Sequence, residues 1–359
     1  MKIKSIFLAS VMALSSTSFA SELENVLFSG EKGVNTDAVI VQKDGKIIYE
    51  KYSRGYNKDT KHLSWSMAKT IAGILVGQAA EEGLLDINGK ISDTFPAFRG
   101  RASTLDVLQM SSGIGFKEEY SGVPVDADVT KMLYMEGPKV GFGNFAMTRK
   151  LNKEQPGDYF YYSSGDTNVL MELLKNKMSE DSYNSYPWKK FFKPLGIEAT
   201  FEQDAKGTFV GSSYIYMTPR DYLKVGSLIM NKGVANGKQI IPDWYFSLMT
   251  QLAPGVDKKA SAGTSQTRAY SMQVTTNLPI SGRNLAPEYK DLPTDSIILI
   301  GHQGQLVVSS PSQKLVIVRL ATDKGASFRR KDFFKEVKTL IKSKGQRLET
   351  AQDTHSELY

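Results

Sequence analysis

The chain has 359 residues and a formal charge of +7, and 41% of its residues are hydrophobic and 23% charged. This ordinary balance excludes a chain that is disordered throughout, and the length suits one large domain or two fused lobes. The absence of cysteine excludes thiol catalysis and thiolate metal sites. The three histidines are scattered, so we expect neither a metal site nor another cofactor.

The first segment has the pattern of a secretory signal peptide. Lys2 and Lys4 give a basic start, an apolar run follows over residues 6–14, and Ser18 and Ala20 put small residues at the cleavage-recognition positions. We therefore expect cleavage after Ala20 and a periplasmic or secreted protein. The apolar run is about half the length that a membrane span needs, so no membrane segment is expected after cleavage.

A β-hairpin and a buried helix are predicted next. Apolar runs over 38–41 and 47–49 flank Asp44–Gly45, a dipeptide typical of a two-residue hairpin turn. From about Ser66 to Leu85 the sequence looks helical and is apolar on most sides. This pattern predicts a helix buried at the centre of the protein.

The remainder divides into a helical middle and a strand-rich end. Residues 91–204 have helix and loop patterns, and Thr218–Pro219 predicts the start of another helix. Strand patterning returns over 296–321, followed by a helix over about 329–347. Eight basic and two acidic residues lie in this last segment. We interpret them as the solvated face of a helix packed on the sheet, rather than a nucleic-acid or membrane surface.

These elements predict an α+β fold, with an antiparallel sheet built from the N- and C-terminal parts, flanked by helices, and an inserted all-helical lobe. The residues 255–263 are expected to form a mobile loop. The expected division is a signal peptide over 1–20, a sheet lobe over 21–90 and 205–345, a helical lobe over 91–204 and a polar tail over 346–359.

Ser66 and Lys69 form the S-x-x-K motif on which the chemistry depends. Residues three apart share a helix face, so a serine at the helix start and a lysine one turn later can touch. The positive end of the helix dipole and the apolar core both favour a neutral amine, which can accept the serine proton. The spacing alone is a weak signal, since Ser29 and Lys32 share it in a polar stretch. A simple helix cap at Ser66 is the alternative.

Two later motifs add candidate groups. Tyr162–Ser164 supplies a tyrosine hydroxyl that can relay a proton, although ordinary packing is the alternative for one of 17 tyrosines. Gly301–Gln305 interrupts two apolar runs, where small residues let a substrate approach and a strand N–H can point at a developing oxyanion. Taken alone, Gly301–Gln305 also suits a tight turn at a strand end.

In this order, the three motifs resemble those of the serine β-lactamase and penicillin-binding superfamily. The stretches 104–113, 211–221 and 233–242 are similar to further segments of that family, so the resemblance spans roughly Ala38 to Lys324. Within the superfamily, the chain is most similar to class C-like esterases and 6-aminohexanoate-dimer hydrolases.

The resemblance implies an acyl-enzyme on Ser66, with Lys69 and Tyr162 moving protons and with either of them as the base. It implies an oxyanion hole made by the backbone N–H groups of Ser66 and Gln305. The implied substrate is a small ester, an amide or a short peptide, and the oligomeric state stays open. The further residues implied to contact the substrate are Ser164, His302, Gln303 and Gly304.

Two positions depart from the family pattern. His302 stands where β-lactamases and peptidases usually carry lysine, and Ser164 stands where class C β-lactamases carry asparagine. A neutral histidine lacks the charge that binds a substrate carboxylate. We therefore expect action on short-chain esters or linear amides, with weak or absent action on penicillins and cephalosporins. The alternative is that Arg268 or Arg283 binds the carboxylate.

Other functions also suit parts of this pattern. A D-amino-acid peptidase or a β-lactamase would use the same site, and a non-catalytic penicillin-binding-type sensor would share the fold but not need intact Ser66, Lys69 and Tyr162. A Ser-His-Asp hydrolase is the remaining enzymatic alternative. The chain lacks a G-x-S-x-G motif, and only His62 and His302 lie outside the tail.

Overall fold

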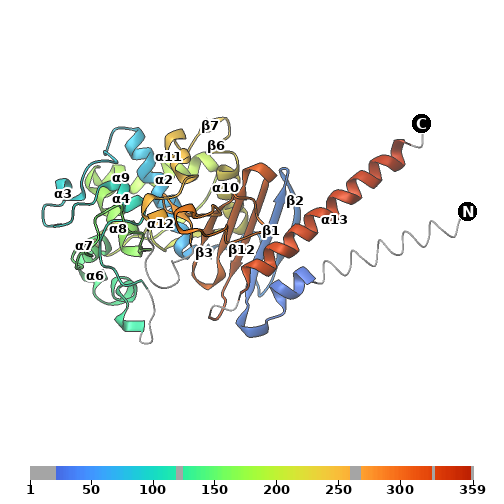
Figure 1. Ribbon diagram of the computed structural model, residues 1–359, viewed down its shortest axis with the longest axis horizontal. Helices are drawn as coiled ribbons and strands as arrows, with labels where there is room; N and C mark the ends of the chain where they lie inside the picture. Colours follow the sequence, from blue (N-terminus) through green and yellow to red (C-terminus); the bar gives the residue numbers. More distant parts are fainter. Residues whose placement is uncertain (1–21, 119–123, 259–267, 326–327, 357–359) are drawn as a thin grey trace, which may run out of the picture.

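The computed structural model describes residues 22–118, 124–258, 268–325 and 328–356, so the predicted signal peptide lies outside the described residues. Long strands gather on one side of the molecule and most helices on the other (Figure 1). The strands are β1 (Thr36–Lys43), β2 (Lys46–Tyr52), β3 (His62–Leu63), β4 (Thr200–Phe201), β5 (Ile215–Met217), β6 (Val234–Ala235), β7 (Lys238–Gln239), β8 (Tyr270–Ser271), β9 (Val274–Thr276), β10 (Ile297–Ile300), β11 (Leu306–Ser310) and β12 (Leu315–Ala321).

Helices occupy most of the chain between the two groups of long strands, and one follows the last strand. They are α2 (Ala68–Glu81), α3 (Ile91–Thr94), α4 (Thr104–Leu108), α5 (Asp128–Thr130), α6 (Gly137–Val140), α7 (Phe142–Met147), α8 (Ser164–Asn176), α9 (Glu180–Pro187), α10 (Pro219–Met230), α11 (Asp243–Met249), α12 (Pro254–Lys258) and α13 (Arg330–Ser356).

The main sheet is antiparallel and joins the two ends of the chain. Its seven strands have the order β2-β1-β12-β11-β10-β9-β8, and Ile40 of β1 pairs with Val318 of β12. This confirms the predicted α+β class. The predicted hairpin turn is also present, with Asp44 at φ 50° and Gly45 at φ 76°, the two positive values that a type I′ turn requires.

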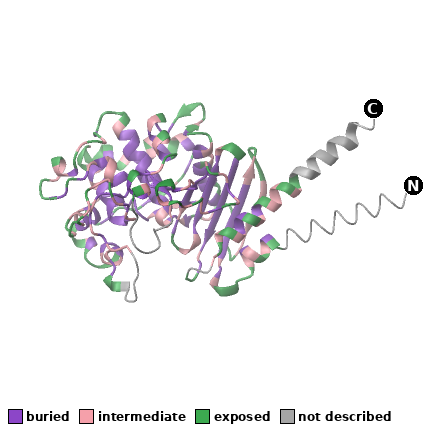
Figure 2. Cartoon of the chain, in the orientation of Figure 1, coloured by how far each residue is buried: buried purple, intermediate pink, exposed green. Residues whose placement is uncertain are grey.

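Alternation along the strands gives the sheet two apolar faces. Ala38 and Ile40 of β1 belong to the core that contains α2 and α10. Val39 and Val41 belong to a second core, which α13 covers with Phe333 and other side chains. Figure 2 shows the strands buried between these layers, so both faces of the sheet are covered.

Helix α2 lies at the centre of the molecule, as its apolar sequence predicted. Every residue from Ala68 to Ala79 is buried. Two glycines let the helix approach its neighbour closely, since a Cβ at Gly77 would lie 2.4 Å from Tyr245 Cδ2. This packing holds α2 against α11, to which Tyr245 belongs.

The end of α2 differs from the prediction. The helix stops at Glu81 rather than near Leu85, because Gly83 adopts φ 72°. The Gly83 N–H donates to Ala80 O at 3.0 Å and the Leu84 N–H to Ala79 O at 2.9 Å. These two bonds form a Schellman ending, which satisfies the last carbonyls of the helix.

Several other predicted elements can be compared directly. Helix α10 begins at Pro219 with a capping box between Thr218 and Asp221, as predicted. Part of the expected 255–263 loop is helical in α12, and its remainder lies outside the described residues. Helix α13 continues to Ser356, beyond the predicted helix end. None of the described helices is both long and apolar enough to span a membrane.

Candidate active site

Ser66 lies in the 3-10 turn η2 (Trp65–Met67), which leads directly into α2. Trp65 has a φ of 45°, a left-handed conformation that is strained for a bulky residue and occurs often at functional sites. The N-cap positions of η2 and α2 are Ser64 and Met67. The alternative of Ser66 as a simple helix cap is therefore wrong.

Lys69 meets Ser66 as the helical spacing predicted. Its side chain is buried, and Nζ donates to Ser66 Oγ at 3.1 Å, to Ser164 Oγ at 2.9 Å and to the Ser212 carbonyl at 3.0 Å. These contacts hold the Lys69 nitrogen against the Ser66 hydroxyl, where a neutral amine can take the serine proton. The arrangement places a proton-carrying group in direct contact with a serine hydroxyl, which is the geometry of an activated nucleophile.

Glu118 extends this chain of hydrogen bonds, and sequence reasoning missed it. The backbone N–H of Ser164 donates to Glu118 Oε2 and the Ser164 hydroxyl to Oε1, both at 2.8 Å. Burial raises the pKa of the Glu118 carboxyl, while the nearby Lys69 charge and the bonds from Ser164 lower it. Glu118 thus fixes Ser164, which in turn contacts Lys69.

Tyr162 adjoins the same group of residues through its ring. Lys69 Nζ lies 5.1 Å from the ring centroid, and the guanidinium carbon of Arg268 lies 5.0 Å from it, both cation–π distances. Among the described residues, no hydrogen bond joins the Tyr162 hydroxyl to Ser66 or Lys69. Catalytic hydrogen bonds are often loose without substrate, so the structure places Tyr162 at the site without assigning it the proton.

A pocket opens beside Ser66. Arg268 is the only charged side chain among the described residues that line it, and Arg283, the other cation considered, is not among them. The lining residues are Ser66, Thr70, Tyr162, Arg268, Tyr270, Gln273, Val274, Thr275, Ile298, Leu299 and Ile300.

The third motif forms a tight turn next to η2. His302–Gly304 is the 3-10 turn η9 between β10 and β11, so the turn reading was correct. Trp65 Nε1 donates to Gln303 Oε1 at 3.1 Å, and the rings of Trp65 and His302 meet edge to face at 5.3 Å. Burial lowers the pKa of His302 from 6.5. The motif therefore brings no cation to the site at neutral pH.

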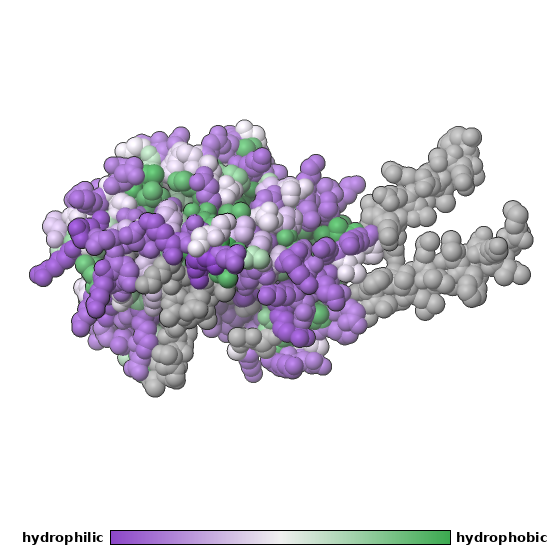
Figure 3. Space-filling view, viewed as in Figure 1, coloured by the Kyte–Doolittle hydropathy of each residue, from purple (hydrophilic) through white to green (hydrophobic). Residues whose placement is uncertain are grey.

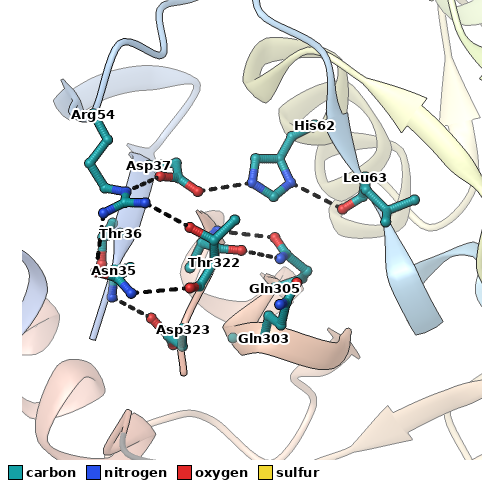
Figure 4. Close-up of polar contacts among 12 residues, drawn as sticks. Asn35, Thr36, Asp37, Arg54, His62, Leu63, Gln303, Gln305, Thr322 and Asp323 are labelled. Atoms are coloured by element: carbon teal, nitrogen blue, oxygen red, sulfur yellow. Dashed lines mark hydrogen bonds and ion pairs between the residues drawn. The ribbon is translucent and has the colours of Figure 1, made fainter. Parts of the chain in front are cut away.

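The Gln305 side chain has a structural role. The side chain is fully buried and its carboxamide bonds both the N–H and the carbonyl of Ala321 (Figure 4). Outside the helices and strands, no backbone hydrogen bond from the N–H groups of Gln305 and Ser66 occurs among the described residues. The missing side chain of Gly301 keeps the two segments close, since a Cβ there would lie 2.5 Å from the Ser64 carbonyl oxygen.

A buried ion pair supports the η9 turn from behind. Arg319 donates to Asp323 at 2.8 and 2.9 Å and to the Gly304 carbonyl at 2.9 Å, and the Asp323 N–H donates to Gln303 O at 3.1 Å. A Cβ at Gly304 would lie 2.1 Å from Asp323 Oδ2. Packing against Asp323 therefore explains by itself why residue 304 is a glycine.

His62 belongs to a structural network rather than to a catalytic triad. Its Nε2 lies 3.1 Å from Asp37 Oδ2 and its Nδ1 lies 3.1 Å from the Leu63 carbonyl, while Arg54 Nε donates to the other Asp37 oxygen at 2.9 Å (Figure 4). Both ring nitrogens are thus engaged without a serine hydroxyl. Among the described residues, no cluster of three or more metal-ligating side chains occurs either.

Asp166, two residues after Ser164, predicts a specific pH dependence of stability. Burial raises the pKa of its carboxyl from 3.8 to about 8, against the hydrogen bond from Ser112 that lowers it. The unfolded chain releases this proton above about pH 4. The folded protein keeps it until about pH 8. The contribution to stability is therefore fully present below pH 4 and is lost as pH rises to 8.

We expect Asp166→Asn to remove this loss. Between pH 5 and pH 8 the unfolding free energy of wild type should fall by about 2–4 kcal/mol more than that of the variant, because each shifted pH unit corresponds to about 1.4 kcal/mol. Urea unfolding at both pH values measures the difference. Asp59→Asn, at a largely exposed side chain, is the matched control. Equal pH dependence of wild type and Asp166→Asn would contradict the prediction.

Comparison with known proteins places the fold and the site in one family. The family model described as Beta-lactamase matches residues 27–339, which is most of the chain. The chain belongs to the Beta-lactamase family. This agrees with the resemblance seen in the sequence motifs, all of which lie inside the matched range.

Individual relatives of this Beta-lactamase family member are distant. It is 26% identical over 231 residues to the 6-aminohexanoate-dimer hydrolase of Paenarthrobacter ureafaciens, covering 60% of this chain and 57% of that protein. A solved structure from Bacillus anthracis, provisionally named a 6-aminohexanoate-dimer hydrolase, superposes with a TM-score of 0.67 at 20% identity over 88% of this chain and 80% of that one. EstCE1, a hydrolase with promiscuous acyltransferase activity, gives 0.64 at 13% identity, covering 91% and 99%.

Proposed function

We propose that this member of the Beta-lactamase family is a serine hydrolase that cleaves an ester or a linear amide through a covalent acyl-enzyme on Ser66. The observation that carries the proposal is the 3.1 Å hydrogen bond between Lys69 Nζ and Ser66 Oγ in a strained turn beside a pocket. The name of the 6-aminohexanoate-dimer hydrolase relative supports an amide or ester substrate. The chain spans just over half of that relative's length. The substrate class is therefore inferred from the residues of the site.

In the proposed reaction, Ser66 Oγ attacks the carbonyl carbon while its proton passes to Lys69 or Tyr162. The oxyanion of the tetrahedral intermediate accepts hydrogen bonds from the backbone N–H groups of Ser66 and Gln305. The bond to the leaving group then breaks, the leaving group takes the proton, and water hydrolyses the acyl-enzyme by the same path in reverse order. Neither step needs a metal or another cofactor.

Ser164 and Glu118 have a positioning role in this proposal. Glu118 holds Ser164 by two hydrogen bonds, and Ser164 Oγ lies 2.9 Å from Lys69 Nζ. A lysine side chain has about 2 kcal/mol of rotamer entropy to lose. Fixing its terminal nitrogen before the substrate arrives therefore lowers the cost of reaching the reactive geometry. The proposal includes export, with cleavage after Ala20, to the periplasm or beyond.

The proposal predicts a clear order of substrates. The purified protein should turn over p-nitrophenyl acetate or butyrate with a kcat/KM at least about tenfold above that for nitrocefin, because His302 offers no full charge where a lysine would bind the β-lactam carboxylate. Steady-state rates on one preparation measure the ratio. Efficient nitrocefin turnover with little esterase activity would make the chain a β-lactamase. No turnover of any ester, amide or D-amino-acid peptide would favour the sensor alternative.

A further inference from the structure

We infer that Glu118 takes up the proton that Lys69 must lose before it can act as a base, and that the Ser164 hydroxyl carries this proton between them. The inference rests on the proposed hydrolysis at Ser66. It goes beyond the positioning role given above in two respects. It assigns the role of base to Lys69 rather than Tyr162, and it makes the activity at neutral pH depend on a carboxyl group that does not touch the substrate.

The three side chains form one continuous line of hydrogen bonds. Lys69 Nζ donates to Ser164 Oγ at 2.9 Å, and Ser164 Oγ donates to Glu118 Oε1 at 2.8 Å. The backbone N–H of Ser164 donates to the second carboxyl oxygen, also at 2.8 Å, and so holds the carboxyl against the hydroxyl. A proton can therefore pass from the lysine to the glutamate over two short bonds, without a large movement of any side chain.

Lys69 cannot act as a base while it is charged. Its Nζ also donates to Ser66 Oγ at 3.1 Å and to the Ser212 carbonyl at 3.0 Å. An ammonium has three donors and no lone pair, so it cannot take the serine proton. An ordinary lysine releases a proton to water only near pH 10.4. A carboxylate at the end of the hydrogen-bond line offers a closer acceptor for that proton.

Burial favours the neutral forms of the lysine and the glutamate. Figure 3 shows hydrophilic residues over much of the face in view, where water stabilises their charges, whereas Lys69 and Ser164 are only 1% and 2% exposed. Transfer of one proton turns an ammonium and a carboxylate into an amine and a carboxyl, which removes two charges from this buried line. In the same direction, burial raises the pKa of Glu118, against the charges of Lys69 and Arg268 that lower it.

The Ser164 hydroxyl suits both charge states of the pair. A hydroxyl donates one hydrogen bond and accepts others, and its proton rotates between neighbours. In the charged pair it accepts from Lys69 and donates to Glu118. After the transfer it accepts from the Glu118 carboxyl and donates to the Lys69 amine. A carboxamide has fixed donor and acceptor ends, so an asparagine at this position would support only the charged pair.

The proposed steps balance without a further reactant. A Lys69 N–H bond breaks as a Ser164 O–H bond forms, and the original Ser164 proton passes to Glu118 Oε1. Rotation about the Cε–Nζ bond then turns the freed lone pair to Ser66, whose proton it takes as Oγ attacks the carbonyl carbon. Lys69 gives this proton to the leaving group and is again a neutral amine when water attacks the acyl-enzyme. Glu118 stays protonated throughout.

Other charged and titratable side chains surround this line of hydrogen bonds in the described part of the chain. Helix α8 contributes Asp166, whose pKa burial raises to about 8. Arg268, before β8, stays charged at every relevant pH, and the rings of Tyr162 and Tyr270 lie beside it. Because Asp166 also titrates near neutral pH, a variant at that position has to be tested separately.

The pH dependence of kcat/KM for p-nitrophenyl butyrate, measured from pH 5 to pH 9 with Ser66→Ala as the blank, tests the inference. Wild type should reach its full kcat/KM by pH 7. In Glu118→Gln the Lys69 proton has no carboxylate to go to, so kcat/KM at pH 7 should fall about tenfold or more and rise again toward pH 9, as water removes the proton. A purely structural loss would lower kcat/KM equally at every pH.

Two substitutions of Ser164 separate the proton transfer from the packing. Ser164→Asn keeps an acceptor for Lys69 and a donor for Glu118 but cannot exchange them, so its pH profile should shift as in Glu118→Gln. Ser164→Thr keeps the hydroxyl and should keep the wild-type profile, even at a lower rate. These two variants decide the question alone if Glu118→Gln does not fold, which melting temperatures at pH 7 and pH 9 check.

Glu172→Gln is the matched control, because this glutamate of α8 also accepts a bond from a hydroxyl, that of Thr208 at 2.7 Å. Glu172→Gln and Asp166→Asn should both keep the wild-type pH profile. A shift in either of them as large as that in Glu118→Gln would assign the effect to another cause and overturn the inference.

The inference is also overturned if folded Glu118→Gln or folded Ser164→Asn keeps the wild-type profile, or if Ser164→Thr shifts as far as Ser164→Asn. Failure of the proposed function gives a different result. In that case, wild type hydrolyses no ester faster than Ser66→Ala does at any pH, and the inference falls with it.

Discussion

Replacing Ser66 with alanine should abolish hydrolysis while the protein stays folded. The hydroxyl is the only group in the described site that both accepts a hydrogen bond from Lys69 Nζ, at 3.1 Å, and lies on the pocket wall. Loss of the attacking atom removes the acyl-enzyme route altogether, so kcat should fall by about 10⁴-fold or more. Steady-state hydrolysis of p-nitrophenyl butyrate measures the loss.

Folding of Ser66→Ala should be nearly normal, since the substitution removes one hydrogen bond worth about 0.5–1.5 kcal/mol. Ser64→Ala is the control, because it removes a serine hydroxyl two residues before Ser66. Ser64 Oγ bonds the carbonyls of Trp65 and Ser213, so this variant should lose stability without removing the nucleophile. Retention of wild-type rates in Ser66→Ala would disprove the assignment.

Lys69 should be the second residue on which turnover depends. Lys69→Met removes the proton carrier but keeps much of the side-chain volume, and Lys69→Arg keeps a charge that cannot give up its proton. Both should lower kcat by about 10²–10⁴-fold, the usual contribution of a general base. Lys224→Met, at an exposed lysine that pairs with Asp221, is the control. Near wild-type kcat in folded Lys69→Arg would exclude Lys69 as base or relay.

The parts of the site that depend on local geometry could be predicted from the sequence. Ser66 and Lys69 are one helical turn apart, so the pattern alone indicated that they touch. Hairpin and strand signals at both ends of the chain indicated the antiparallel sheet, and the order of the three motifs indicated the family.

Contacts that only the tertiary structure creates could not be predicted. Glu118 and Ser164 are 46 residues apart, and neither periodicity nor a motif connects them. Arg268 was one of two candidate cations, and only its place on the pocket wall distinguishes it from Arg283. The Gln305 side chain bonds the backbone of β12, a contact that no motif indicates. The apolar pattern continues to about Leu85, but α2 ends earlier because of the conformation of Gly83.

The central claim, an acyl-enzyme on Ser66, is tested most directly by trapping the nucleophile. The protein is treated with a fluorophosphonate, digested and analysed by mass spectrometry, with Ser66→Ala treated in parallel. The account predicts one adduct, located on Ser66 and absent from the variant, with loss of esterase activity in proportion to labelling. A preparation that hydrolyses p-nitrophenyl butyrate but is labelled on another residue, or keeps its activity when Ser66 is fully modified, would contradict it.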